Sequence, residues 1–224
     1  MDAPPDRRSL KELYARRFGP KERAEKNALW KVLCQSFLQR YVSESDVVVD
    51  LGAGYCEFIN NIRCGRKIAV DLNEDTRQYA ARDVTVILEP ADAVSSLEDA
   101  TVDVVFASNL FEHLPSKEVL TVVLGEIRRV LRPGGRLLVV QPNIRYAYKE
   151  YWDYFDHHLP LSHLSLAEVL ELEGFAIEEV RPRFLPYTVK SRFPKSGLLI
   201  RLYLRLRPLQ MLLGKQMFLV ASKP

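Results

Sequence analysis

The hydrophobic and polar positions of this 224-residue chain change their period near residue 40. Over residues 9–40 the apolar residues recur at helical spacing, and Gly19 and Pro20 divide that stretch into two predicted helices. Further along, short β-branched runs alternate with helical segments, and these runs predict seven strands. The predicted strands are residues 47–49, 67–70, 84–88, 102–107, 136–140, 175–180 and 216–221.

Two well-marked helices lie between the later strands. Ser116 begins one that runs towards Leu131, where an Arg-Pro-Gly-Gly run ends it, and residues 164–173 form the other. Continuous apolar strands that alternate with helices build a parallel sheet that is covered on both faces. The sequence therefore predicts the α/β class, with a doubly wound, mostly parallel sheet and an N-terminal helical cap.

Candidate binding residues follow the predicted strands directly. In a doubly wound sheet, ligands bind beyond the carboxyl ends of the strands, where the strand order reverses. Gly52 and Gly54 follow the first strand, and glycines at this spacing allow a tight turn and a close approach to a ligand before a helix begins. Asp71 ends the second strand, where a carboxylate can accept hydrogen bonds from both hydroxyls of a ribose. Asp92 follows the third strand, where a carboxylate can accept from an exocyclic amino group.

Residue 57 distinguishes between two adenosine-type ligands. A nicotinamide dinucleotide fingerprint requires a third glycine at this position, where the chain has Glu57. The carboxylate of Glu57 would face the pyrophosphate that such a loop receives. S-adenosylmethionine has no phosphate and carries a positive sulfonium and amine, so acidic residues such as Asp50 and Glu57 favour it.

The strand-end motifs together resemble those of the class I S-adenosylmethionine-dependent methyltransferases, and within them the type-11 group. The resemblance covers about residues 45–181 and is carried by VVVDLGAGYCEF, AVDLN, Asp92, VDVVFASNLFEHLP and LRPGGRLLVVQPN. It implies a seven-stranded sheet in which the last strand is antiparallel and inserted between the fifth and sixth. It also implies S-adenosylmethionine as the cofactor and S-adenosylhomocysteine as its product.

The same resemblance assigns residues to parts of the cofactor. The family commonly has glycine where this chain has Cys56, a departure that bears on the local turn. The implied cofactor-binding residues are Asp50, Gly52, Ala53 and Gly54 for the methionine part, Asp71 and Leu72 for the ribose, Asp92 and Ala93 for the adenine, and Asn109 and Leu110 beside the sulfonium.

An aromatic insert after the fifth strand would overhang the acceptor side of the pocket in this fold. Histidines there or after the fourth strand could remove a proton as the methyl group is transferred, or could simply pack locally. No metal is expected, because His158 and His163 lack a paired acid at helical spacing. A cysteine nucleophile is not indicated either, since no base is identified beside Cys56 or Cys64. The candidate catalytic residues are His113, Asp156, His157 and His158.

The chain is expected to form a single domain over residues 1–224. No apolar run reaches the roughly 18 residues that span a bilayer, and the first residues lack the apolar stretch of a signal peptide, so a cytoplasmic location is expected. The predicted segments are an N-terminal cap (9–40), a cofactor-binding core (45–145), an acceptor-side insert (146–163) and a C-terminal half (164–224) that contains a basic leucine-rich segment (196–215).

Charge is distributed unevenly along the chain. Residues 181–224 contain ten Lys or Arg and no acid, whereas residues 1–180 contain 22 basic and 29 acidic residues. Such a split indicates contact with an anionic partner. Read as one helix, the basic leucine-rich segment aligns its leucines on one side, as in helices that lie in an anionic membrane interface. Residues 192–215 would then dock at the inner face of the membrane, or else the leucines cover the sheet and the arginines face water.

The predicted function is that of an S-adenosylmethionine-dependent methyltransferase (class EC 2.1.1) acting on a small-molecule, glycan or lipid-linked acceptor, at oxygen. A nucleic-acid (RNA) methyltransferase and a catalytically silent partner subunit stay open as alternatives. Against nucleic acid, the fourth strand ends in Ser-Asn-Leu-Phe, not in the Asn-Pro-Pro-Tyr type of loop that grips a flipped base. The aromatic residues also cluster away from the basic stretch. The oligomeric state is left open.

Overall fold

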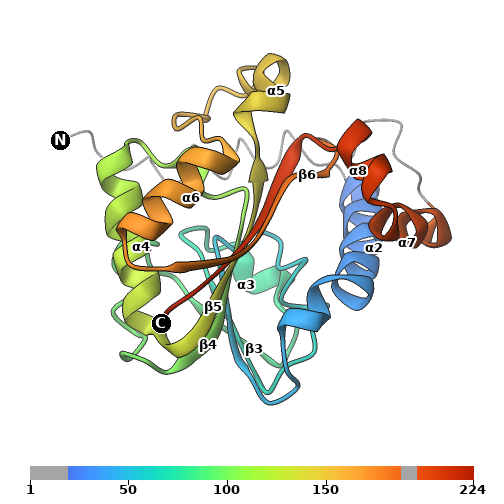
Figure 1. Cartoon of the computed structure of the whole chain (residues 1–224). Coiled ribbons are helices and arrows are strands. Elements are labelled where there is room, and N and C mark those ends of the chain that lie inside the picture. Colours follow the sequence, from blue (N-terminus) through green and yellow to red (C-terminus); the bar gives the residue numbers. More distant parts are fainter. Residues whose placement is uncertain (1–19, 188–195) are drawn as a thin grey trace.

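The computed structural model describes residues 20–187 and 196–224, which form one seven-stranded sheet with helices on both faces (Figure 1). Residues 9–19 of the predicted cap lie outside the described residues. The strands are β1 (Val47–Leu51), β2 (Arg66–Val70), β3 (Val84–Ile87), β4 (Val102–Ser108), β5 (Leu131–Pro142), β6 (Ala176–Leu185) and β7 (Gln216–Ser222).

The strand order is β3-β2-β1-β4-β5-β7-β6. Strand β7 runs antiparallel to both β5 and β6, and the other neighbouring pairs are parallel. The predicted α/β fold and its inserted antiparallel last strand are therefore confirmed. Because β1 pairs with both β2 and β4, the strand order reverses there, and a ligand is expected beyond the carboxyl ends of these three strands.

The helices form two layers around the sheet. Helices α4 and α6 cover one face, and α2, α7 and α8 lie at the other (Figure 1). The helices are α2 (Pro20–Ser36), η1 (Leu38–Tyr41), α3 (Thr76–Tyr79), η2 (Phe111–His113), α4 (Lys117–Val130), α5 (Ile144–Tyr151), α6 (His163–Leu172), α7 (Gly197–Arg205) and α8 (Arg207–Leu213), where η marks a 3-10 helix.

Alternate side chains of the central strands fill two separate apolar clusters. Val105 of β4 belongs to the same cluster as Leu124 of α4, whereas the next residue, Phe106, belongs with Trp30 of α2 to the cluster on the other face. The rings of Trp30 and Phe106 meet edge to face, with centroids 5.7 Å apart. Burial on both faces explains why these strands read as continuous apolar runs.

The helix predicted from Ser116 begins as expected. Ser116 is its N-cap, and its hydroxyl accepts a hydrogen bond from the amide of Val119. Helix α4 ends at Val130, but β5 starts at once, at Leu131, rather than at residue 136. A shift in register between Val102 and Val104 of the neighbouring strand accommodates the Arg-Pro-Gly-Gly run within the strand.

The prediction of a single helix in the basic leucine-rich segment is wrong. Leu206 adopts an extended conformation (φ −98°, ψ 90°) and separates α7 from α8. Pro208 lies in the first turn of α8, because its missing amide and fixed φ fit a helix start but not a helix interior. None of the helices in the described part of the chain is both long and apolar enough to cross a bilayer.

Candidate active site

The loop after β1 is closely attached to β2. The amides of Gly52 and Ala53 donate to the carbonyl of Val70, at 2.8 and 3.2 Å. Gly52 and Gly54 have φ values of +74° and +51°, which glycine adopts without strain. A Cβ on Gly52 would lie 3.0 Å from Cδ1 of Leu110, whereas a Cβ on Gly54 would meet nothing within 4 Å. The loop thus leaves open space beside Gly54, where a ligand can approach the backbone.

Asp71 connects this loop to the end of β2. Its Oδ2 accepts a hydrogen bond from the amide of Gly54 (2.7 Å), and its Oδ1 accepts one from the amide of Asn73 (2.8 Å). Burial raises the pKa of Asp71, and backbone amides, that of Leu72 among them, partly oppose this. Each carboxylate oxygen has a second lone pair, so Asp71 can still accept from a pair of ribose hydroxyls.

Asp50 is buried beneath the same loop. Its Oδ2 accepts a hydrogen bond from the amide of Ile59 (3.3 Å), and burial raises its pKa well above the ordinary value. The neighbouring Glu57 forms an ion pair with Lys26 of α2, at 3.1 Å. Lys26 therefore neutralises part of the negative charge that the sequence predicted around the ligand. Nothing in the sequence indicated this ion pair.

The helix predicted after the glycine loop is not formed. Residues 53–62 make successive turns instead, with hydrogen bonds such as those from the amide of Cys56 to the carbonyl of Ala53 (2.7 Å) and from the amide of Asn60 to the carbonyl of Cys56 (3.0 Å). Cys56 has a φ of +58°, in the left-handed region that disfavours side chains. The resembling family commonly has glycine at this position, and glycine adopts such a φ without strain. The difference between Cys56 and that glycine therefore affects the backbone of the turn.

The structure brings most of the predicted cofactor residues to one edge of the sheet. Asp50, Gly52, Ala53, Gly54, Asp71, Leu72, Asn109 and Leu110 lie at or just beyond the carboxyl ends of β1, β2 and β4. Asn109 has a φ of +49°, and its side-chain amide donates to the hydroxyl of Ser108 (3.1 Å). Asp92 and Ala93 lie in the loop after β3 and are exposed. The contacts of these residues with a cofactor stay predictions.

Three of the four predicted catalytic residues come together with one that the sequence reasoning missed. Nδ1 of His113 lies 3.2 Å from Oδ2 of Asp156 and 2.9 Å from its carbonyl oxygen. The ring of His157 meets that of His113 edge to face, with centroids 5.0 Å apart. Glu112 is the missed member and is only 2% exposed. We call Glu112, His113, Asp156 and His157 the histidine cluster.

The fourth predicted catalytic residue contributes through its backbone. The side chain of His158 is exposed, while the amides of His158 and Leu159 donate to the carbonyl of Glu112, at 2.8 and 3.1 Å. These bonds tie the insert to η2, directly after β4. Glu112 follows a strand end in the sequence, but only its burial under the insert distinguishes it from an ordinary solvated carboxylate.

Burial and neighbouring charges shift the pKa values of this cluster. Burial raises the pKa of Glu112 to about 7, and the charge of His113 opposes that rise. Burial alone would lower the pKa of His113, but its hydrogen bond with Asp156 and the charges of Glu112 and Asp156 outweigh burial and raise it. The cluster can thus gain or lose a proton near neutral pH.

Tyrosines of the insert surround His157. The ring of Tyr154 stacks on that of His157, with centroids 5.0 Å apart. The ring centroid of Tyr151 lies 4.6 Å from that of His157. The hydroxyls of Tyr151 and Tyr187 and the Oε2 atom of Glu112 are buried without a hydrogen-bond partner among the described residues. Buried polar atoms nearly always have partners, so these three atoms are expected to meet polar groups other than those of the described residues.

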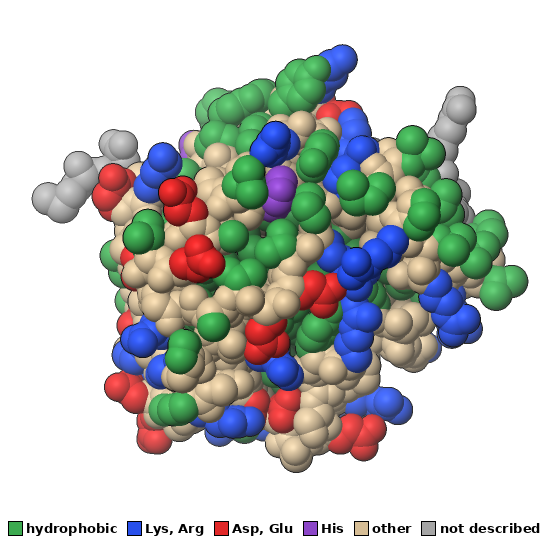
Figure 2. All heavy atoms as spheres, in the orientation of Figure 1, with side chains coloured by type: hydrophobic (Ala, Val, Ile, Leu, Met, Phe, Trp, Pro, Cys, Tyr) green, Lys and Arg blue, Asp and Glu red, His purple; other side chains and the backbone are tan. Residues whose placement is uncertain are grey.

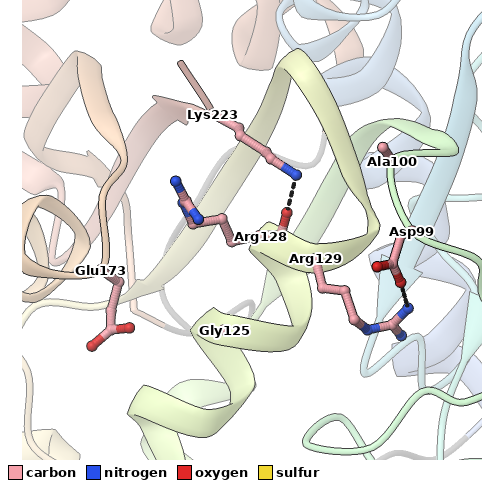
Figure 3. Close-up of a pocket in the computed structure, with 7 residues that line it drawn as sticks. All are labelled: Asp99, Ala100, Gly125, Arg128, Arg129, Glu173 and Lys223. Carbon is pink, nitrogen blue, oxygen red and sulfur yellow. Dashed lines mark hydrogen bonds and ion pairs between the residues drawn. The ribbon is translucent and has the colours of Figure 1, made fainter.

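A hollow at the other end of the sheet has a different character (Figure 3). It has a volume of about 460 Å³ and is lined by Asp99, Ala100, Gly125, Arg128, Arg129, Glu173 and Lys223. Nζ of Lys223 donates to the carbonyl of Arg128 (2.7 Å), and Arg129 pairs with Asp99 (2.6 Å). Because Ala100 precedes β4, this hollow lies at the amino ends of the strands and contains no predicted site residue.

Two glycine substitutions are expected to have opposite effects. Gly52→Ala should lower the free energy of unfolding by about 1–3 kcal/mol, because a Cβ is strained at φ +74° and crowds Leu110. Gly125→Ala should raise it by about 0.5–1 kcal/mol, because Gly125 lies inside α4 with nothing within 4 Å of an added Cβ. Urea unfolding of both variants measures the difference, and equal effects would contradict the loop geometry.

Comparison with known proteins agrees with this geometry. Residues 49–139 match the family model of the type-11 methyltransferase domain. A curated protein from Aspergillus luteorubrus, named "Probable methyltransferase ltbC", is 29% identical over 119 residues, which are 46% of this chain and 42% of that protein. The chain thus spans less than half the length of that relative.

Solved structures share the fold over nearly the whole chain. A SAM-dependent methyltransferase from Archaeoglobus fulgidus is 23% identical with a TM-score of 0.65, covering 88% of this chain and 94% of that one. A chain from the complex of the Haloferax volcanii Trm112 methyltransferase activator with a methyltransferase is 18% identical with a TM-score of 0.68, covering 91% and 94%. The strand-end motifs, the strand order and the family match agree: the chain has the fold of the class I methyltransferases, and its residues 49–139 match a type-11 methyltransferase domain.

Proposed function

We propose that this chain transfers a methyl group from S-adenosylmethionine to a hydroxyl oxygen of an amphipathic, lipid-linked acceptor at an anionic membrane surface. The observation that carries the proposal is the edge where Asp71 holds the loop of Gly52 and Gly54, next to a buried cluster of titratable side chains. When bound, S-adenosylmethionine supplies a methyl group on a positive sulfonium.

The residues at this edge fit that cofactor. The open space beside Gly54 admits a ligand against the backbone, and Asp71 offers lone pairs to ribose hydroxyls. Asn109 and Leu110, beyond β4, would flank the sulfonium, and Asp92 and Ala93 would meet the adenine. The chain's main task is then orientation, which can supply about 7–11 kcal/mol of the barrier.

The histidine cluster is assigned to the acceptor side. A hydroxyl that becomes an ether must lose its proton, and a group with a pKa near the working pH handles a proton best. Glu112, whose pKa is raised to about 7, is such a group, and it lies beside His113, which Asp156 orients. The unpartnered hydroxyls of Tyr151 and Tyr187 would donate to oxygens of the acceptor.

The acceptor class is proposed from the surface of α7 and α8. Ile200, Tyr203 and Leu204 are buried, but most other apolar residues of these helices are exposed, as are Arg201, Arg205 and Arg207. Figure 2 shows apolar side chains over α5 and over α7 and α8, with Lys and Arg side chains between them. We call the exposed apolar residues of α7, of α8 and of the junction between them the docking face: Leu198, Leu199, Leu202, Leu206, Leu209, Met211, Leu212 and Leu213.

Leucines beside arginines, with no acid after residue 180, are suited to an anionic bilayer interface. Such docking would bring a lipid-linked acceptor to the ligand edge of the sheet from the cytoplasmic side. The insert adds exposed aromatic residues near that edge, among them Trp152 and Phe155, which is 94% exposed.

The test is transfer of a labelled methyl group. The chain is incubated with methyl-labelled S-adenosylmethionine and vesicles made from extracted membrane lipids. The products are then separated, and their masses are measured by mass spectrometry. We expect labelled lipid with a 14-dalton increase (one CH2), and label at the level of the Asp71→Ala variant would contradict the proposal. Label in added RNA, but not in lipid, would favour the nucleic-acid alternative.

A further inference from the structure

The histidine cluster has the composition of a metal site. Glu112, His113 and His157 each place one potential ligand atom so that all three lie within 4.8 Å of one another. Two of them come from η2 after β4, and the third comes from the insert more than forty residues later. Two imidazoles and one carboxylate form a common ligand set for zinc in enzymes.

A buried oxygen at this place lacks a partner. Oε2 of Glu112 makes no hydrogen bond within the described residues, although the side chain is only 2% exposed. A carboxylate that is buried without a partner is costly, and it is usually paired with a cation or coordinated to a metal. A divalent ion between Glu112 and the two histidines would satisfy this oxygen.

Asp156 supports the same interpretation. It approaches Nδ1 of His113 through its carboxylate (3.2 Å) and its carbonyl (2.9 Å), which leaves Nε2 of that ring for a further ligand. Histidines that bind metals commonly donate their other ring nitrogen to a carboxylate or carbonyl, which fixes the tautomer and the ring orientation.

We propose that Glu112, His113 and His157 bind a divalent transition-metal ion of the zinc class, with Asp156 as the positioning residue for His113. Nitrogen and oxygen donors in this number suit zinc and leave a fourth position for water or an acceptor oxygen. The charges of Glu112 and Asp156 together would balance the ion.

Binding would draw the insert towards η2. Ligands about 2.0–2.2 Å from a tetrahedral ion lie roughly 3.4 Å from one another. The three ligand atoms lie within 4.8 Å of one another, so binding requires them to approach by about 1.4 Å at most. The hydrogen bonds from the amides of His158 and Leu159 to Glu112 already hold the insert in position for this movement.

The ion's binding does not depend on methyl transfer, but its role at the acceptor rests on the proposed function. An imidazole nitrogen that binds a cation has no lone pair left for a proton. A loaded cluster would therefore polarise the acceptor's hydroxyl oxygen through the ion instead of acting as a base.

Equilibrium dialysis of the whole chain, first stripped with a chelator, tests the site with Zn²⁺ alone. We expect one ion per chain, a binding constant at least about 100-fold weaker in His157→Ala and Glu112→Gln, and one weaker by about 10–100-fold in Asp156→Asn. The neighbouring His158→Ala is the matched control and should bind zinc as the unaltered chain does. Mg²⁺, which prefers oxygen ligands, should not compete.

Two further measurements keep the test decisive. Co²⁺ in place of zinc should give the visible absorption of a tetrahedral site, and His157→Ala should remove it. Circular dichroism identifies any variant that has not folded. Such a variant is excluded, and the zinc affinities of the folded variants test the site. Zinc binding that is absent, or unchanged in the folded His157→Ala and Asp156→Asn variants, overturns the inference. Zinc binding without any methyl transfer would sustain the metal site and refute the proposed function.

Discussion

Replacing Asp71 with alanine is expected to weaken the binding of S-adenosylmethionine by about 10- to 150-fold. A hydrogen bond to a charged acceptor contributes about 1.5–3 kcal/mol, and each 1.4 kcal/mol is a factor of ten in affinity. The variant also removes the acceptor for the amides of Gly54 and Asn73, so the loop that should meet the methionine part loses its attachment to β2.

Two other variants separate these effects. Asp71→Asn keeps one oxygen and should lose less affinity than Asp71→Ala. Asp83→Ala is the matched control, because Asp83 is an exposed aspartate before β3 that pairs only with Lys67 at 2.9 Å among the ion pairs of the described residues. Titration calorimetry measures all three, and an unchanged affinity in Asp71→Ala would refute the assignment of Asp71 to the ribose.

The sheet was predictable because its central strands are buried on both faces. Val105 and Phe106 contact helices on opposite sides, so both positions had to be apolar and the run stood out from the helical segments around it. Asp71 was predictable for a related reason. A polar residue at the end of an apolar strand marks the carboxyl edge, where neighbouring parallel strands end together.

The turn after β1 and the break at Leu206 depend on local backbone geometry. The glycine pattern suggested a helix after the loop, but Cys56 adopts a left-handed conformation and the chain continues in turns. Pro208 was a visible signal against one long helix, since proline fits only the first turn. The leucine spacing nevertheless favoured a single helix, because the leucines recur at helical spacing on both sides of the break.

Glu112 could not be found from its own surroundings in the sequence. A carboxylate after a strand end is ordinarily solvated, and its burial here results from the insert, whose His158 and Leu159 bind its carbonyl. The pairing of His113 with Asp156 likewise joins residues 43 positions apart. Contacts of this range follow from the tertiary fold and not from any local period.

The surface of α7 and α8 shows both alternatives that the leucine spacing left open. Ile200, Tyr203 and Leu204 pack into the apolar cluster around α2, as a covering helix would. Leu198 and Leu212, however, are 74% and 69% exposed, and they lie among exposed arginines. The helices therefore have enough buried side chains to be anchored and still leave the docking face to contact lipid.

The double variant Leu198→Asp and Leu212→Asp is expected to reduce binding to anionic vesicles by more than about 100-fold. Burial of each leucine side chain in the lipid stabilises binding by about 1.5–3 kcal/mol, which the variant loses. Each new carboxylate is also repelled by the anionic headgroups. Because both side chains are exposed, the melting temperature should stay unchanged. Flotation with phosphatidylglycerol vesicles at low salt measures the effect, and binding should weaken as salt screens the arginines.

Leu172→Asp is the matched control for this result. Leu172 is 79% exposed, but it lies at the end of α6, outside the docking face, so its substitution should leave vesicle binding unchanged. A loss of binding equal to that of the double variant would show that any exposed leucine contributes, and the docking face would lose its special role. If the unaltered chain stays at the bottom of the gradient at low salt, the membrane proposal fails, and the acceptor must be sought among molecules free in solution.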